Sequence, residues 1–283
     1  MPVRHLKRRL ITRRLPRCSP AGGYVQIELR FVIVETGGTK AMTSLTLPNV
    51  RRKAVGRPFY MTMSLVTAAV IIGGFSQTVP GDFTREPGMP ILLSVHGTVF
   101  TLWVLLFVAQ PTFIARGSIA LHRRVGWAGA VLATAMLVMG VAATLFAIRY
   151  NFVPGFFPRP IFLVMNLIGI SVFAGLVGAG IALRKRAEWH KRLMLCATIS
   201  ILGPGLGRLL PMGSFGAAAP LVMFGAIALF AFAGPVVDVI VRRRVHPAYY
   251  WGVSTILLSM MMVGPIAFSP LGTALLTVVG RAA

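Results

Sequence analysis

Two histidines of this sequence are placed where paired imidazoles could hold a cofactor. His122 and His190 stand in LHRRV and WHKRL, each followed by two bases and an apolar residue at the start of an apolar run. Two such histidines at one depth would give the bis-imidazole ligation of haem. The alternative is that both rings pack at the protein surface, where the neighbouring bases meet anionic lipid headgroups. Haem b held by His122 and His190 is one hypothesis, and headgroup binding is the other.

Three further polar side chains are predicted near the opposite ends of apolar runs. His96 and Asn166 each lie five residues into a run, and Arg208 lies three residues before the end of one. At about 1.5 Å per residue all three are within roughly 8 Å of the same surface. An ionisable residue inside a membrane marks a functional site by default, so this layer could serve transport or sensing of a small molecule. The alternatives are core packing of His96, an interhelical hydrogen bond from Asn166 and snorkelling of Arg208.

Asp238 is the one acidic residue within an apolar run. Arg242, four residues later, would pair with it on one helix face. The alternative is a partner across the bundle or a protonation site. The sequence contains no nucleophile elbow, phosphate loop, HExxH motif or carboxylate pair, and its two cysteines, Cys18 and Cys196, form no CxxC pattern. A hydrolase or a metal centre is therefore not supported, and the chain is interpreted as non-enzymatic.

The elements that must position these residues are membrane helices. The chain is 56% hydrophobic and 12% charged, and its mean hydropathy is +0.78, whereas a soluble domain carries about a quarter charged residues. Runs of about 20 apolar residues match the thickness of a bilayer. We predict an all-α, polytopic membrane bundle of about seven helices, at 59–79, 91–114, 124–148, 161–183, 193–211, 220–243 and 248–268. The fifth is the least regular, because Gly203-Pro204-Gly205 would kink or break a helix.

One face of the second predicted helix combines polar and aromatic residues. His96, Phe100, Trp103, Phe107 and Gln110 recur at steps of four and three. We expect this face to point into the bundle, because lipid would penalise its polar ends. Glycines such as the Gly73-Gly74 pair are predicted to mark close helix contacts.

The distribution of basic residues predicts the orientation. The net charge is +23, but the bases are clustered between apolar runs rather than on one folded face, so nucleic acid is not the expected partner. Three alternate loops are strongly basic and the loops between them are not. By the positive-inside rule these loops and the N-terminus are cytoplasmic, and the C-terminus is periplasmic, in a bacterial inner membrane.

The two ends of the chain are predicted to lie outside the bundle. Residues 1–58 hold 13 of the 29 lysines and arginines and are interpreted as a largely disordered basic segment. Within it, 24–34 alternates weakly and could be one strand, which alone would lack a partner. We suspect that the true start is Met42, so that 1–41 would not belong to the protein. The bundle then covers 59–269, and 270–283 is predicted to be a short tail.

The motifs HGTVFTLW, LHRRVGW and WHKRLMLCATISILGPGLGRLLP resemble a group of uncharacterised bacterial multi-pass membrane proteins. The resemblance covers roughly 58–245 and implies a helical bundle. Its signature positions here are His96, His122, Arg123, Gly126, His190, Lys191, Arg192 and Arg208. There is also a fainter similarity to transmembrane b-type cytochromes, which implies haem.

Three functions are therefore expected. The first is a non-enzymatic inner-membrane component that binds anionic lipid or partner subunits, in a homo- or hetero-oligomer, through its basic loops. The second is a haem protein that transfers electrons through His122 and His190. The third is a transporter or sensor that uses His96, Asn166 and Arg208.

Overall fold

The computed structural model describes most of the backbone, namely residues 7–18, 24–36, 39–46, 50–78, 81, 84, 88–155 and 157–281. Side chains are described from residue 58 to 280, with the same gaps and residue 217 also left out. The chain divides into two compact units, Met1–Arg57 and Pro58–Ala283, within one residue of the predicted boundary.

The first unit contains an antiparallel sheet in the segment predicted to be largely disordered. Its strands are β1 (Lys7–Cys18), β2 (Tyr24–Thr36) and β3 (Thr39–Thr46), in the order β1-β2-β3. The alternating stretch 24–34 lies in β2, and it has a partner on each side, since Ile11 pairs with Phe31 and Ile33 with Met42. The expected lack of a partner is therefore corrected for these strands. Residues 1–6, 19–23 and 37–38 lie outside the described part, and the start at Met42 stays a prediction.

The second unit is the predicted all-α bundle. In chain order its elements are α1 (Val50–Phe75, of which 58–75 belongs to this unit), α3 (Ile91–Ala115), α4 (Ile119–Arg149), α5 (Arg159–Ala182), α6 (Ala187–Ser200), α7 (Gly203–Leu209), the 3-10 helix η1 (Met212–Ala218), α8 (Ala219–Arg242), α9 (Pro247–Ala267) and α10 (Pro270–Arg281). Among the described residues six helices are long and apolar enough to cross a membrane: α1, α3, α4, α5, α8 and α9. The protein is therefore a multi-pass membrane protein, and these six spans lie within a few residues of their predictions.

The fifth predicted span is not one helix. Helix α6 ends at Ser200, and the N–H groups of Ile201 and Leu202 donate to carbonyls three residues back instead of four. Pro204 then has no N–H to continue the ladder, and α7 adds only seven residues. The 14 residues of α6 cover roughly 21 Å, which is too short for a bilayer core. The expected break near Gly203-Pro204-Gly205 is confirmed, so six rather than about seven spans are found among the described residues, and the predicted tail contains α10.

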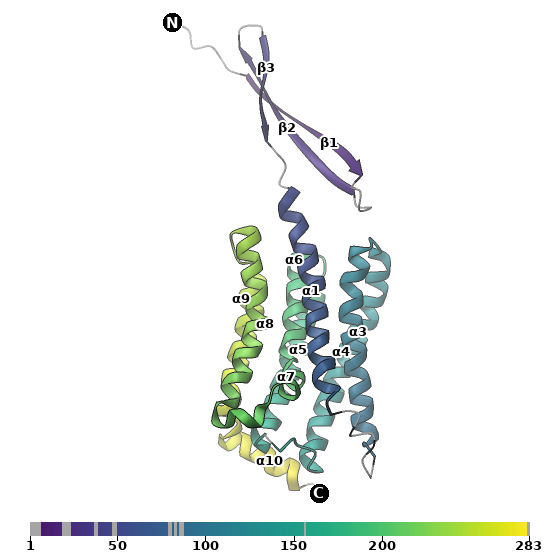
Figure 1. Cartoon of the computed structure of the whole chain (residues 1–283), viewed down its shortest axis with the longest axis vertical. Helices are drawn as coiled ribbons and strands as arrows, with labels where there is room; N and C mark the ends of the chain where they lie inside the picture. The colour runs from purple at the N-terminus through teal and green to yellow at the C-terminus, as the bar shows by residue number, and fades with distance from the viewer. Residues whose placement is uncertain are drawn as a thin grey trace. The chain divides into compact units, whose positions relative to one another are not determined.

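Helix α6 lies at the centre of the bundle, packed against α5, α8 and α9 (Figure 1). All five consecutive side chains from Leu195 to Ile199 are buried, so α6 is enclosed on every side, as expected for a helix in the core. Helix α3 also reaches it, since the indole N–H of Trp103 donates to Thr198 Oγ1 at 3.3 Å.

The inward face of α3 agrees with its prediction. Trp103 is only 2% exposed, and its ring meets that of Phe173 on α5 edge to face. Leu102 and Leu105, on the other side of α3, are 49% and 57% exposed and face the lipid. The hairpin connections α3–α4, α5–α6 and α8–α9 lie together at one end of the bundle, which we call the basic end (Figure 1).

Candidate functional site at the basic end

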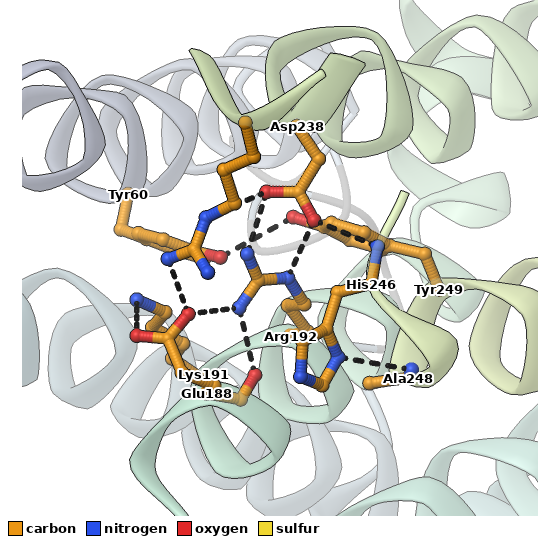
Figure 2. Close-up of polar contacts among 9 residues, drawn as sticks. Tyr60, Glu188, Lys191, Arg192, Asp238, His246, Ala248 and Tyr249 are labelled. Atoms are coloured by element: carbon orange, nitrogen blue, oxygen red, sulfur yellow. Dashed lines mark hydrogen bonds and ion pairs between the residues drawn. The ribbon is translucent and has the colours of Figure 1, made fainter. Parts of the chain in front are cut away.

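A buried ion pair joins the centre of the bundle to α8. Arg192 of α6 donates from Nε to Asp238 Oδ2 at 3.0 Å and from Nη2 to Oδ1 at 2.5 Å (Figure 2). The side chains are 1% and 7% exposed. Such a two-pronged contact satisfies both carboxylate oxygens, which a charged group needs when it leaves water. Asp238 thus pairs across the bundle with Arg192. It also forms the predicted ion pair with Arg242 on its own helix, which is longer, at 3.6 Å between Nε and Oδ1.

Glu188 links three bases at the rim of this pair. It stands in the first turn of α6, where a carboxylate is favourable, and Lys191 and Arg192 follow at the helical spacing of three and four. Glu188 accepts from both at 2.7 Å and also from Arg242 of α8. Burial alone would raise the pKa of Glu188, but the hydrogen bonds and charges of Lys191 and Arg192 lower it to about 2. The carboxylate is therefore ionised at physiological pH.

Two tyrosines cover the ion pair and bring in α1 and α9. The Arg192 guanidinium lies 5.2 Å from the ring centre of Tyr249, and the Lys191 ammonium lies 5.1 Å from that of Tyr60. The two hydroxyls are 3.4 Å apart (Figure 2). Cation–π contacts of this kind are stronger where water is excluded. Four helices, α1, α6, α8 and α9, therefore meet around one arginine.

His246 caps the N-terminus of α9. Its Nδ1 accepts from the N–H of Ala248, and its own backbone N–H donates to Asp238 at 3.1 Å. Pro247 occupies the first helical position, where the missing N–H costs nothing. Burial and then the charge of Arg192 lower the pKa of His246. This histidine therefore stays neutral and caps a helix.

His122 and His190 do face each other. Their ring centres are 6.2 Å apart and their planes are inclined by 84°. His190 Nδ1 lies 2.9 Å from the carbonyl of Gly180, in the last turn of α5. Because a carbonyl only accepts, Nδ1 carries the proton and Nε2 keeps a free lone pair. His190 therefore both caps α5 and presents a nitrogen that could bind a metal.

Gln110 of α3 completes the surroundings of His122. With its amide oriented to satisfy its neighbours, the nitrogen donates to His122 Nδ1 and the oxygen accepts from the N–H of Gly126 at 3.2 Å. In that orientation the proton of neutral His122 is on Nε2. Ligation through Nε2 would need the opposite amide orientation, with Gln110 accepting from Nδ1–H.

Within the described part of the chain, no group of three His, Cys, Asp or Glu side chains could hold a metal ion.

The surface of the basic end is strongly cationic. Its connections and helix ends carry these exposed bases: Arg116, Arg123, Arg124, Arg184, Lys185, Arg186, Arg242, Arg243 and Arg244. After residue 86 the sequence contains two acids, Glu188 and Asp238, and both are engaged in the internal network. The Arg184 guanidinium lies 5.5 Å from the ring centre of Trp127, which is 61% exposed. Positive charge and an interfacial tryptophan thus occupy the same place.

The other predicted site residues lie toward the opposite end and have separate partners. His96 Nδ1 is 3.3 Å from the carbonyl of Met139, and its ring stacks on Phe100. Asn166 donates to the carbonyl of Phe162 on its own helix. Arg208 donates to Thr78 Oγ1 and to the carbonyl of Pro204. No direct hydrogen bond among His96, Asn166 and Arg208 is seen in the described contacts.

The sequence interpretation missed the role of Glu188 and of Arg192. The sequence marks Arg192 as one base of a basic loop and as a signature position of the resemblance, and neither predicts that its side chain is buried. The spacing of Glu188 to Lys191 and Arg192 is a helical ion-pair pattern that the sequence does contain. Asp238, a lone acid in an apolar run, also required a basic partner, but Arg192 lies 46 positions earlier in the chain and so gives no local signal.

No family model, no curated protein and no solved structure matches this chain.

Proposed function

We propose that this protein is a non-enzymatic component of a bacterial inner membrane that binds anionic phospholipid headgroups at its basic end. The observation that supports this is the set of nine exposed bases there, while the two nearby acids, Glu188 and Asp238, are already paired with bases of the protein. Each base near an anionic surface contributes about 1 kcal/mol of attraction. By the positive-inside rule the basic end is cytoplasmic and the C-terminus periplasmic. An acidic partner subunit in a hetero-oligomer is the competing occupant of this surface.

A preference for anionic over zwitterionic lipid should be measurable through quenching of the fluorescence of Trp127. In nanodiscs, brominated phosphatidylglycerol should quench Trp127 more than brominated phosphatidylcholine does at the same mole fraction. The background carries Trp251→Phe, because Trp251 is also exposed, and a Trp127→Phe protein supplies the signal to subtract. Changing Arg184, Lys185 and Arg186 to Gln should weaken the preference by up to about 5-fold per base, and salt should weaken it too.

The matched control is Arg149→Gln, at the opposite end of α4, which should leave the preference unchanged. Equal quenching by both lipids would refute headgroup binding. If the lipids quench equally and an acidic subunit copurifies with the parent but not with the triple variant, the surface binds protein instead.

A second candidate is electron transfer through haem b, and the facing rings of His122 and His190 favour it. The faint similarity to b-type cytochromes points the same way. Bound haem would supply one-electron redox chemistry. The chain's contribution would be to orient the rings: Gly180 fixes the tautomer of His190, and Gln110 would have to fix that of His122.

A reduced-minus-oxidised visible spectrum tests the haem hypothesis. Protein purified in detergent from cells supplied with haem is expected to show sharp bands that disappear in His122→Ala and in His190→Ala. His96→Ala, at the other end of the bundle, is the control and should keep them. A flat spectrum from folded protein would exclude this candidate.

A further inference from the structure

Helix α10 is a short helix at the end of the bundle opposite the basic end (Figure 1). Its 12 residues span roughly 18 Å, too little to cross a bilayer. The Ser269 hydroxyl accepts from the N–H of Gly272 and so caps its start. The helix packs against α4, α5 and α9. It therefore belongs to the bundle without being a span.

Three faces of α10 differ in their surroundings. Gly272, Leu276 and Val279 are buried or half-buried and form the face toward the bundle. At Gly272 the contact is closest, because an added Cβ would lie 2.8 Å from the carbonyl carbon of Ala267 and closer still to the oxygen of Ile266. This fixes a sharp turn between α9 and α10, so the helix lies across the end of the bundle rather than continuing α9.

A second face is apolar and exposed. Leu271 and Val278 are 63% and 69% exposed, and Leu275 between them is 39% exposed. These residues recur at steps of four and three, so they form one stripe along the helix. A third face carries Thr273 and Thr277, which are exposed and whose hydroxyls donate to carbonyls of their own segment, at Ser269, Pro270 and Thr273. An exposed apolar stripe beside a more polar face is the pattern of a helix that lies in the membrane interface.

We propose that α10 is an interfacial helix whose Leu271, Leu275 and Val278 stripe inserts into the acyl boundary of the leaflet opposite the basic end. The occupant is the protein's own bilayer, because exposed apolar side chains precede the stripe in the spanning helix α9 and at the junction. Phe268, at the junction, is 65% exposed, and Met261 of α9 is 58% exposed. The stripe also begins where α9, having crossed from the basic end, reaches the other surface. The proposal is independent of headgroup binding at the basic end.

Spin labels can test both exposed faces in liposomes. A Cys18→Ser background leaves only Cys196, which is fully buried. Leu275→Cys and Thr277→Cys, two residues apart on different faces, each receive a nitroxide. Relaxation by oxygen, which concentrates in lipid, should be several-fold stronger at 275, and relaxation by a water-soluble nickel complex several-fold stronger at 277.

Reference labels at Leu229→Cys on the lipid face of α8 and at Arg243→Cys at the basic end define the two limits. Equal nickel accessibility at 275 and 277 would overturn the proposal, because it would place the stripe in water. A label at 275 that neither reagent reaches would also overturn it, because a second protein surface would then cover the stripe. Val278→Cys repeats the measurement on the same face if the Leu275 variant does not fold.

Discussion

Asp238→Asn is expected to destabilise the bundle by about 3 to 5 kcal/mol, the cost of breaking a buried ion pair by removing one charge. The substitution keeps the shape of the side chain but leaves the Arg192 guanidinium, 1% exposed, facing a neutral amide. Glu188 still contacts Arg192 but is 42% exposed, so water screens its charge and it replaces only part of the lost attraction.

Thermal unfolding in detergent measures this loss. Cys196 is buried in α6, so a maleimide dye that fluoresces on reaction with a thiol reports the opening of the core in a Cys18→Ser background. At roughly 2 to 4 °C per kcal/mol for a protein of this size, the midpoint should fall by about 6 to 20 °C. Arg242→Gln is the matched control: its side chain is 39% exposed and 3.6 Å from Asp238, so a loss of about 1 kcal/mol or less is expected.

The double variant Arg192→Met with Asp238→Val separates the cost of an orphaned charge from the loss of the pair. Replacing a buried pair by apolar residues is often neutral or stabilising. The double variant should therefore recover most of the stability that Asp238→Asn loses. It should not recover all of it, because the backbone N–H of His246 also donates to Asp238 and would lose its acceptor. A midpoint for Asp238→Asn equal to that of the parent would show that Arg192 and Asp238 are not paired in the membrane.

The helices show how much of the fold could be predicted from the sequence. Apolar run length located the six long spans, because lipid imposes one thickness on all of them. The same rule predicted the fifth span, 193–211, as one of seven, although the break after Ser200 divides it into two helices. Run length does not report whether a backbone ladder is continuous, and the Gly203-Pro204-Gly205 signal was the only warning. Strand β2 pairs with its neighbours in the sequence, and the pairing was missed because β1 is rich in bases and contains Pro16, which are weak strand signals.

The candidate site was predicted in part. The repeated motif around His122 and His190 placed two histidines at equal depth, and the structure brings their rings together edge to face. Depth alone could not show that His246 caps a helix or that Asn166 bonds to its own helix. Helix rotation and neighbour identity decide those contacts, and both arise from packing of the whole bundle. For the same reason the sequence could not choose Arg192 as the partner of Asp238.

The neighbouring glycines of α1 should respond in opposite ways to the same substitution. Gly73 has open space, since an added Cβ would lie 3.8 Å from a methyl group of Leu209, an ordinary contact. At Gly74 the added Cβ would lie 2.8 Å from the carbonyl carbon of Gly205 and closer still to its oxygen. A Cβ added at Gly205 would in turn lie 3.1 Å from the Cα atom of Ile71 in α1. The two helices therefore meet backbone to backbone, as small residues in membranes allow.

Gly74→Ala is accordingly expected to destabilise the protein by about 1 to 3 kcal/mol, because α7 must move away from α1. Gly73→Ala should instead be neutral or stabilising by up to about 1 kcal/mol, since alanine favours the helix and meets no obstacle. The Cys196 thiol assay measures both in parallel. Equal midpoints for the two variants would mean that α7 does not pack on α1. If only Gly74→Ala unfolds early, the backbone contact between Gly74 and Gly205 is one of the contacts that hold α7 in place, together with its packing on α8.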